Sequence, residues 1–368
     1  MRYLITAGPV YGPLDDNKIV SNRSRGIWAI KLAEALHEQG DEVTLLLPDT
    51  HPTKKGLPGT VRFHRGFDAY QEICSRVAPS VDGAVMAAAV VNWIPAKPFP
   101  GKMATKGFEP GEMISVPFVL APRILAQMRP ANASLNLVGC KLTSGVSQEE
   151  LIDIAYELLL DTKCNAVVAN DLSNLKSKCL VYPDRTVIPY HLGNENTFIR
   201  DVTEVLQDRH FRTLPGEVPF IPGHALDLAC KIFDGLVDKY RDRFVTRTTG
   251  AHTHTFGSLA VKIWGSCWLC SGRHKDAGFT SKDAVLARLD RDRVVVETHR
   301  GKATLNAPRL MSMGNQTGCR AVVHFHEQLP GVETIPYAPP GTVRDLHKGY
   351  SRQYNIRGHG CISDAELV

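Results

Sequence analysis

The sequence lacks a long hydrophobic run, contains few cysteines and carries little excess charge. Its most apolar stretch, residues 83–91, is far shorter than the ~20 residues that a membrane-spanning helix needs. Nine cysteines scattered over 368 residues exclude a small disulfide scaffold. Forty-three Lys and Arg against 38 Asp and Glu give a net charge of +5, too small to predict a nucleic-acid partner. Because the N-terminus also lacks a secretory h-region, we expect a soluble cytoplasmic protein with no membrane partner.

What is present is the composition of an ordinary globular protein. The shares of 43% hydrophobic and 22% charged residues argue against disorder and fibrous repeats. The length favours two domains, and residues 212–224 are rich in Pro and Gly, as a linker is. The predicted domains are therefore residues 1–211 and 225–368, joined by the linker 212–224.

The first 50 residues predict one β-α-β unit. Residues 3–7 form an apolar run that stops at Gly8-Pro9, residues 27–38 carry apolar side chains at helical spacing, and residues 42–47 are continuously apolar. Further elements are expected as strands at 83–91, 135–140 and 166–169 and as a helix at 148–160. This alternation predicts an α/β fold with a Rossmann-like, doubly wound parallel sheet.

The loop after the first strand contains residues 22–26 (NRSRG) directly before the predicted helix. An open α/β sheet binds its ligand outside the carboxyl ends of its strands, and helix N–H groups together with arginines favour an anion. The loop is neither a dinucleotide-binding G-x-G-x-x-G nor a P-loop. A solvated basic loop with Ser24 as the helix N-cap accounts for the same residues, so this segment alone leaves both interpretations open.

Four blocks follow one another in a recognisable order. They are residues 4–9 (LITAGP), 22–26 (NRSRG), 86–93 (MAAAVVNW) and 168–173 (VANDLS). Together they resemble the phosphopantothenoylcysteine synthetase family, the ligases of coenzyme A biosynthesis, over residues 1 to about 210. The resemblance implies that CTP or ATP with Mg²⁺ activates a carboxylate as an acyl-nucleotide, which an amine then attacks to form an amide. The family's own pair is phosphopantothenate and cysteine.

The resemblance also assigns residues to this chemistry. It implies Asn22 as a catalytic group facing the acyl-nucleotide and Lys102 as a catalytic phosphate clamp. The implied nucleotide-binding residues are Gly8, Ser24, Arg25, Gly26, Asn92, Lys106, Asn170 and Asp171. Arg25 stands where the family has a second serine and Asn92 where it has an aspartate, and these two departures bear on which anion and nucleotide the site takes.

The second half contains one pair of residues with the spacing of metal ligands, His324 and His326. Residues two apart on a strand face the same side, so both imidazoles can reach one metal ion. Catalytic zinc commonly has three protein ligands, and His359 is the candidate for the third. On an apolar strand, such a pair by itself is often incidental.

Further motifs give the pair a context. They are residues 257–262, 271–272, 321–326, 335–342 and 359–360. In this order they resemble the class II aldolase/adducin family over residues 225–368. The resemblance implies a second α/β domain that holds Zn²⁺ on His324, His326 and His359 and polarises a carbonyl or enediolate oxygen. The family's catalytic Glu is missing near residue 305, and Glu327 is the expected substitute.

A structural zinc site is the competing interpretation of other residues in this half. His252, His254, Cys267 and Cys270 supply a possible His₂Cys₂ set. The three-residue spacing of the cysteines would point them to opposite faces of a strand, and the two histidines fit the lining of the active site instead.

The leading hypothesis is a bifunctional metabolic enzyme acting on small molecules. It joins a carboxylate–amine ligase to a zinc-dependent aldolase-like lyase for a small phosphorylated or oxygenated compound. The alternatives are a single zinc aldolase, epimerase or dehydratase with a non-catalytic N-terminal scaffold, or a non-catalytic assembly protein. Both resemblances imply a homo-oligomer, a dimer or tetramer.

Overall fold

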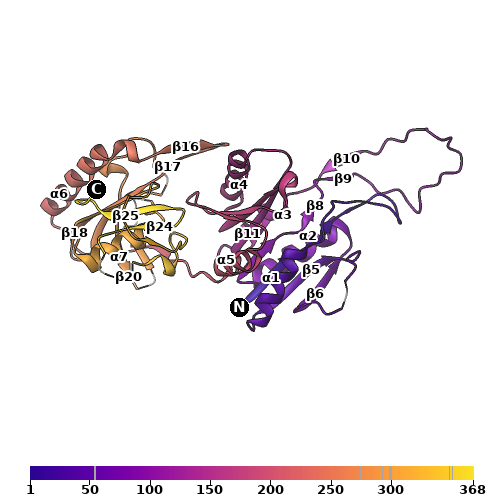
Figure 1. Ribbon diagram of the computed structural model, residues 1–368, viewed down its shortest axis with the longest axis horizontal. Helices are drawn as coiled ribbons and strands as arrows, with labels where there is room; N and C mark the ends of the chain where they lie inside the picture. The colour runs from indigo at the N-terminus through magenta and orange to yellow at the C-terminus, as the bar shows by residue number, and fades with distance from the viewer. Residues whose placement is uncertain (54, 274, 292, 298–300, 348, 350) are drawn as a thin grey trace. The chain divides into compact units, whose positions relative to one another are not determined.

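The computed structural model describes residues 1–368 apart from 54, 274, 292, 298–300, 348 and 350. The chain divides into two compact units, and each has its own large sheet (Figure 1). The first unit consists of Met1–Leu151, Leu158–Leu180 and Pro189–Gln207, and the second of Ile152–Glu157, Val181–Ile188 and Asp208–Val368. The prediction of two α/β units is confirmed.

The first unit contains an eight-stranded sheet. Its order is β14 (Val187–Tyr190), β13 (Lys178–Val181), β12 (Ala166–Asp171), β11 (Asn136–Thr143), β7 (Gly83–Met86), β1 (Arg2–Thr6), β5 (Glu42–Pro48) and β6 (Thr60–His64). Each neighbouring pair from β12 to β6 is parallel. Counted along the chain, these six strands have the order of a doubly wound sheet, which reverses between β1 and β7.

Five helices accompany this sheet. They are α1 (Ile27–Glu38), α2 (Gly66–Val77), α3 (Ile124–Ala131), α4 (Gln148–Thr162) and α5 (Glu195–Gln207). The predicted helix at 27–38 is confirmed in α1, because Ala29, Leu32, Ala33 and Leu36 form its buried stripe. Short strands extend the loops at one end of the sheet: β2 (Pro9–Val10), β3 (Gly12–Pro13), β4 (Ile19–Val20), β8 (Ala89–Val90), β9 (Trp93–Pro95) and β10 (Phe118–Leu120).

The second unit contains a nine-stranded, mostly antiparallel sheet. Its order is β15 (Arg212–Pro215), β21 (Arg293–Val296), β20 (Val285–Asp290), β19 (Cys267–Cys270), β18 (Ser258–Trp264), β22 (Ala321–Phe325), β25 (Gly360–Asp364), β24 (Gln353–Ile356) and β23 (Thr334–Ile335). Side chains alternate between two cores along β22. Val322 packs in the core of α7 (Ala307–Thr317), whereas Val323 and Phe325 pack in the core of α6 (Gly223–Lys239).

The segment 212–224 differs from the predicted linker. Residues Arg212–Pro215 form β15, which pairs in parallel with β21, and α6 begins at Gly223. The Pro and Gly content suggested a connection, but an edge strand tolerates proline because one side of it needs no hydrogen bonds. Among the described residues, no helix combines the length and apolar character required to cross a membrane.

Candidate functional site

The loop after β1 approaches the start of α1 so closely that it requires glycine. Gly26 has φ +65°, and a Cβ there would lie 2.5 Å from the backbone nitrogen of Gly8 and 2.9 Å from Cβ of Ala7. Gly26 is also the N-cap of α1, without a side-chain hydrogen bond. The alternative with Ser24 as N-cap is therefore wrong. The free N–H groups at the start of α1 lie beside the carboxyl end of β1, where a doubly wound sheet binds its ligand.

Asn22 connects this loop to the chain that follows β7. Its Nδ2 donates to the carbonyl oxygens of Ala89 (3.2 Å) and Val90 (2.9 Å). Asn92 follows directly and is exposed. The structure thus brings Asn22 next to the residues that precede Asn92, at the point where the strand order reverses.

The predicted phosphate-binding cations are exposed. Arg25 lies in the loop before α1, while Lys102 and Lys106 lie on the long connection between β9 and β10 (Figure 1). The backbone N–H of Met103 donates to Asp15 at 2.9 Å, which anchors the Lys102 end of the connection. Exposed cations on loops can adapt to a triphosphate, and they account for part of the chain's basic excess.

Hydrogen bonds surround Asp171, one of the residues predicted to bind the nucleotide. Its carboxylate accepts hydrogen bonds from the hydroxyls of Ser173 (2.5 Å) and Thr143 (2.6 Å) and from the N–H of Gly145 (3.0 Å). The Ser173 bond and then the Thr143 bond lower the pKa of Asp171. These contacts hold the loops after β11 and β12, whereas Asn170, at the same strand end, is half-buried.

In the second unit, the three predicted metal ligands converge. Each of His324, His326 and His359 has a ligand atom, and these atoms lie within 4.8 Å of one another. The ring centroids of His324 and His359 are 4.4 Å apart. Burial, and then the neighbouring His359 and His326, lower the pKa of His324 well below its ordinary value. A neutral imidazole is the form that binds a metal ion.

Hydrogen bonds at Nδ1 orient two of these rings. His324 Nδ1 lies 2.8 Å from the carbonyl oxygen of Cys361, and His359 Nδ1 lies 2.8 Å from Asp184 and 2.9 Å from the hydroxyl of Thr186. The Nε2 atoms of both histidines are buried, and the described residues give them no hydrogen-bond partner. Buried polar atoms are normally satisfied. Two unpartnered nitrogens in one cluster, each with Nδ1 anchored, fit the donor set of a zinc site.

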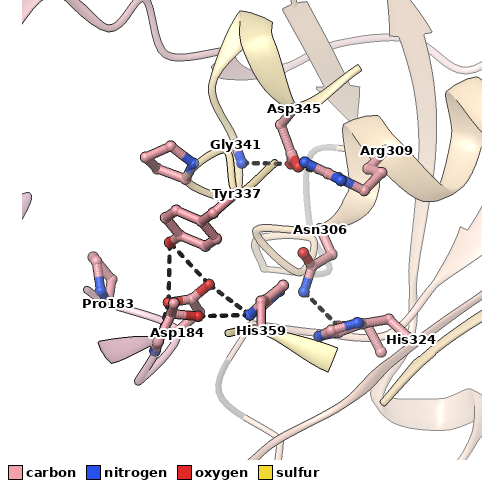
Figure 2. A network of polar contacts seen from close by, with 12 residues as sticks. Pro183, Asp184, Asn306, Arg309, His324, Tyr337, Gly341, Asp345 and His359 are labelled. Carbon is pink, nitrogen blue, oxygen red and sulfur yellow. Dashed lines mark hydrogen bonds and ion pairs between the residues drawn. The ribbon is translucent and has the colours of Figure 1, made fainter. Parts of the chain in front are cut away.

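Sequence analysis missed the carboxylate of this cluster. Asp184 and Thr186 lie between β13 and β14, far from the histidines in sequence, and no motif marks them. Figure 2 shows Asp184 between Tyr337 and His359, and the Tyr337 hydroxyl donates to its carboxylate at 3.1 Å. Tyr337 does lie within the predicted motif 335–342, so only its role was missed.

The acid predicted to replace the family's catalytic Glu is Glu327, the residue after His326. Glu327 forms an ion pair with Arg243 and is exposed. It lies beyond the end of β22 at Phe325, and its catalytic role stays a prediction.

The competing His₂Cys₂ set is not brought together. His252 and His254 lie on β17 (His252–Thr255), which pairs with β16 (Thr246–Thr249), whereas Cys267 and Cys270 are buried in β19. Within the part of the chain that the structure describes, the histidine triad is the one group of at least three potential ligands close enough to share a metal ion.

A cavity of about 310 Å³ also belongs to the second unit. Its lining includes Arg273, Lys302 and Thr304, and the Nε of Arg273 is buried without a hydrogen-bond partner among the described residues. The hydroxyl of Thr304 lies 2.8 Å from that of Ser258. Ser258 on β18 is the register partner of His324 on the neighbouring strand β22. Two cations in a cavity suit an anionic group on a small molecule.

A family model described as the DNA/pantothenate metabolism flavoprotein C-terminal domain matches residues 1–192. The chain belongs to this family. The match includes every residue predicted for the nucleotide site, from Gly8 to Asp171. The predicted resemblance of this part of the chain to the phosphopantothenoylcysteine synthetase family is thus confirmed at the level of the family.

Relatives of this DNA/pantothenate metabolism flavoprotein domain carry the name Coenzyme A biosynthesis bifunctional protein CoaBC. The protein from Thermococcus kodakarensis is 26% identical over 48% of this chain and 43% of its own length. The protein from Mycolicibacterium smegmatis is 28% identical over 46% of this chain and 42% of its own length. The chain therefore spans less than half the length of these curated relatives.

Solved structures are similar at a lower level. The DNA/pantothenate metabolism flavoprotein from Streptococcus pneumoniae has a TM-score of 0.49 and 17% identity, over 56% of this chain and 98% of its own. YgbL from Klebsiella pneumoniae, provisionally described as an aldolase/epimerase/decarboxylase, has a TM-score of 0.30 and 11% identity, over 39% of this chain and 83% of its own. The aldolase-like activity of the second unit stays a prediction.

Proposed function

We propose that the chain is a bifunctional metabolic enzyme, with a nucleotide-dependent carboxylate–amine ligase in its first unit and a zinc-dependent lyase in its second. The ligase rests on the close approach of Gly26 to Gly8 and on the hydrogen bonds of Asn22 to the chain after β7, where the strand order reverses, in a chain of this family. The observation that carries the lyase is the triad with its two unpartnered Nε2 atoms.

In the ligase, a carboxylate attacks the α-phosphorus of CTP or ATP and releases pyrophosphate. The N–H groups at the start of α1 bind phosphate oxygens, while Arg25, Lys102 and Lys106 offset the negative charge that develops. Mg²⁺ would add charge at the same phosphates. An amine then attacks the acyl carbon and releases the nucleoside monophosphate. The names of the relatives favour phosphopantothenate and cysteine as the first pair to test.

The ligase is tested by pyrophosphate release. We expect release from CTP or ATP to require phosphopantothenate, and to continue beyond one turnover only when cysteine is also present. Lys102→Ala should reduce the rate at least about tenfold, because one charge contact in the transition state is lost. Lys97→Ala is the matched control on the same connection and should keep the rate. Release that ignores the carboxylate, or survives Lys102→Ala, contradicts the proposal.

In the lyase, His324, His326 and His359 would hold Zn²⁺, which supplies a Lewis acid for a carbonyl or enediolate oxygen. The described chain contributes an anionic-group site in the cavity lined by Arg273 and Lys302. A small oxygenated substrate with a phosphate or carboxylate group fits these charges.

Metal analysis tests the site directly. We expect one zinc ion per chain after dialysis, and none in His326→Ala. His252→Ala changes a histidine of similar chemistry on β17 and should retain the ion. Zinc should also raise the apparent stability of the apo-protein by mass action, more than 2 kcal/mol at about 100 times Kd. Equal zinc content in the two variants argues against the triad.

A further inference from the structure

We propose that Asp184 is a positioning residue of the histidine site, supplied by the connection between β13 and β14. This inference rests on the proposed metal role of the histidines and goes beyond it, because it assigns a charged partner from the first half of the chain. The segment Val181–Ile188 belongs to the second unit although it joins two strands of the first sheet.

The carboxylate of Asp184 is fixed on three sides. Oδ2 lies 2.8 Å from Nδ1 of His359, the N–H of Thr186 donates to Oδ1 at 3.0 Å, and the Tyr337 hydroxyl donates to both oxygens at 3.1 and 3.3 Å (Figure 2). Its side chain is 5% exposed. A carboxylate held this way has little freedom to serve any group other than His359.

This contact decides which nitrogen of His359 can bind a metal ion. A carboxylate that accepts from Nδ1–H keeps the proton there and leaves the Nε2 lone pair for the cation. His324 has a neutral carbonyl, that of Cys361, in the same position. Asp184 thus adds a negative charge next to the cation that the backbone carbonyl does not provide.

The segment that carries Asp184 is itself well anchored. The carbonyl oxygen of Pro183 accepts a hydrogen bond from Tyr156 at 3.1 Å, and the rings of Tyr182 and Tyr337 lie 4.7 Å apart. Arg185 donates to the hydroxyl of Thr249 at 2.8 Å. Because these contacts hold the backbone on both sides of Asp184, the metal affinity depends on this segment.

The test is the zinc affinity of the full chain, measured by competition with a chromophoric chelator. Asp184→Asn keeps the shape of the side chain and removes its charge, so we expect Kd for zinc to rise about 10- to 100-fold, as for other such partners of ligating histidines. Asp153→Asn removes the half-exposed carboxylate that pairs with Arg185 on the same segment, and should leave Kd unchanged. In ¹⁵N spectra of the metal-free protein, the proton of His359 should move from mostly Nδ1 toward a mixture in Asp184→Asn alone.

The possible outcomes separate this inference from the proposed function. If the unaltered chain binds no zinc, both fail. If it binds zinc and Asp184→Asn has the same Kd and the same His359 tautomer, the positioning role is overturned and the metal site stands. If Asp184→Asn does not fold, Tyr337→Phe decides: a Kd roughly two- to fivefold higher, the worth of one hydrogen bond, supports the role, and an unchanged Kd overturns it.

Discussion

A comparison of Gly26 with Gly40 distinguishes the cost of a left-handed backbone conformation from the cost of a close atomic contact. Both have positive φ, +65° and +86°, but a Cβ at Gly40 meets no described atom within 4 Å, whereas one at Gly26 meets the backbone of Gly8. We expect Gly40→Ala to lose about 1–2 kcal/mol of unfolding free energy for the left-handed conformation alone. Gly26→Ala should lose more than this and should also lose nucleotide-dependent stabilisation, measured by thermal shift with CTP and ATP. Equal losses and retained nucleotide binding would show that the approach is unimportant.

Lys275 is a buried ammonium in the second unit. Burial lowers its pKa from 10.5 to about 8, so the folded state disfavours its charge. The unfolded state binds more protons between these values, and stability therefore rises with pH from about 8 to 10.5. We expect Lys275→Met to be more stable than the unaltered chain at pH 7, by about 3 kcal/mol at most, with the difference vanishing above pH 10.5. Denaturant unfolding at both pH values measures this.

A matched control for this prediction is Lys282→Met, at an exposed position. It should change stability by less than about 0.5 kcal/mol at either pH. If Lys275→Met shifts stability equally at both pH values, the effect comes from packing and not from the buried charge.

At the scale of elements, α7 lies so close to the sheet that one helix position must be glycine. A Cβ at Gly314 would lie 2.1 Å from the Trp268 ring. Alanine in a helix gains about 1 kcal/mol over glycine, but overpacking a buried ring costs about 1–3 kcal/mol, so Gly314→Ala should destabilise the second unit. Gly235→Ala, in α6 with no described atom within 4 Å of the added Cβ, should instead gain up to about 1 kcal/mol. Denaturation midpoints of the two variants should move in opposite directions.

The elements show where periodicity is a sufficient guide. The helix α1 was predicted at its observed bounds because one buried stripe repeats over its whole length. The strand β15 was missed because four residues with a terminal proline have no readable period. Its strand character comes from pairing with β21, a partner about 80 residues later in the chain.

At the scale of the whole molecule, two activities on one chain should be separable by single substitutions. We expect Lys102→Ala to reduce pyrophosphate release at least about tenfold and leave zinc content unchanged. His326→Ala should lose the zinc and keep pyrophosphate release, since the two residues belong to different compact units. Parallel assays of both variants measure this. A variant that lost both properties would contradict separable activities, and an unaltered chain with neither property would favour an assembly protein.

The candidate sites divide in the same way between local pattern and distant contact. His324 and His326 could be paired from the sequence because the two-residue period of a strand places them on one face. The hydrogen bonds of Asp171 could not be predicted, because their donors come from the carboxyl ends of two strands, β11 and β12. Asp184 could not be found, since nothing in its neighbouring residues indicates that His359 lies 2.8 Å away.

The sequence by itself determined the two α/β units, the doubly wound first sheet, the loop of residues 22–26 and the three converging histidines. These follow from short-range periodicity and from motifs whose residues lie close together in the chain. The tertiary structure alone decided that Val181–Ile188 belongs to the second unit, that Asp184 contacts His359 and that Glu327 pairs with Arg243. Such a contact joins residues that are far apart in the chain, so it depends on the whole fold. The conformational preferences of neighbouring residues do not determine it.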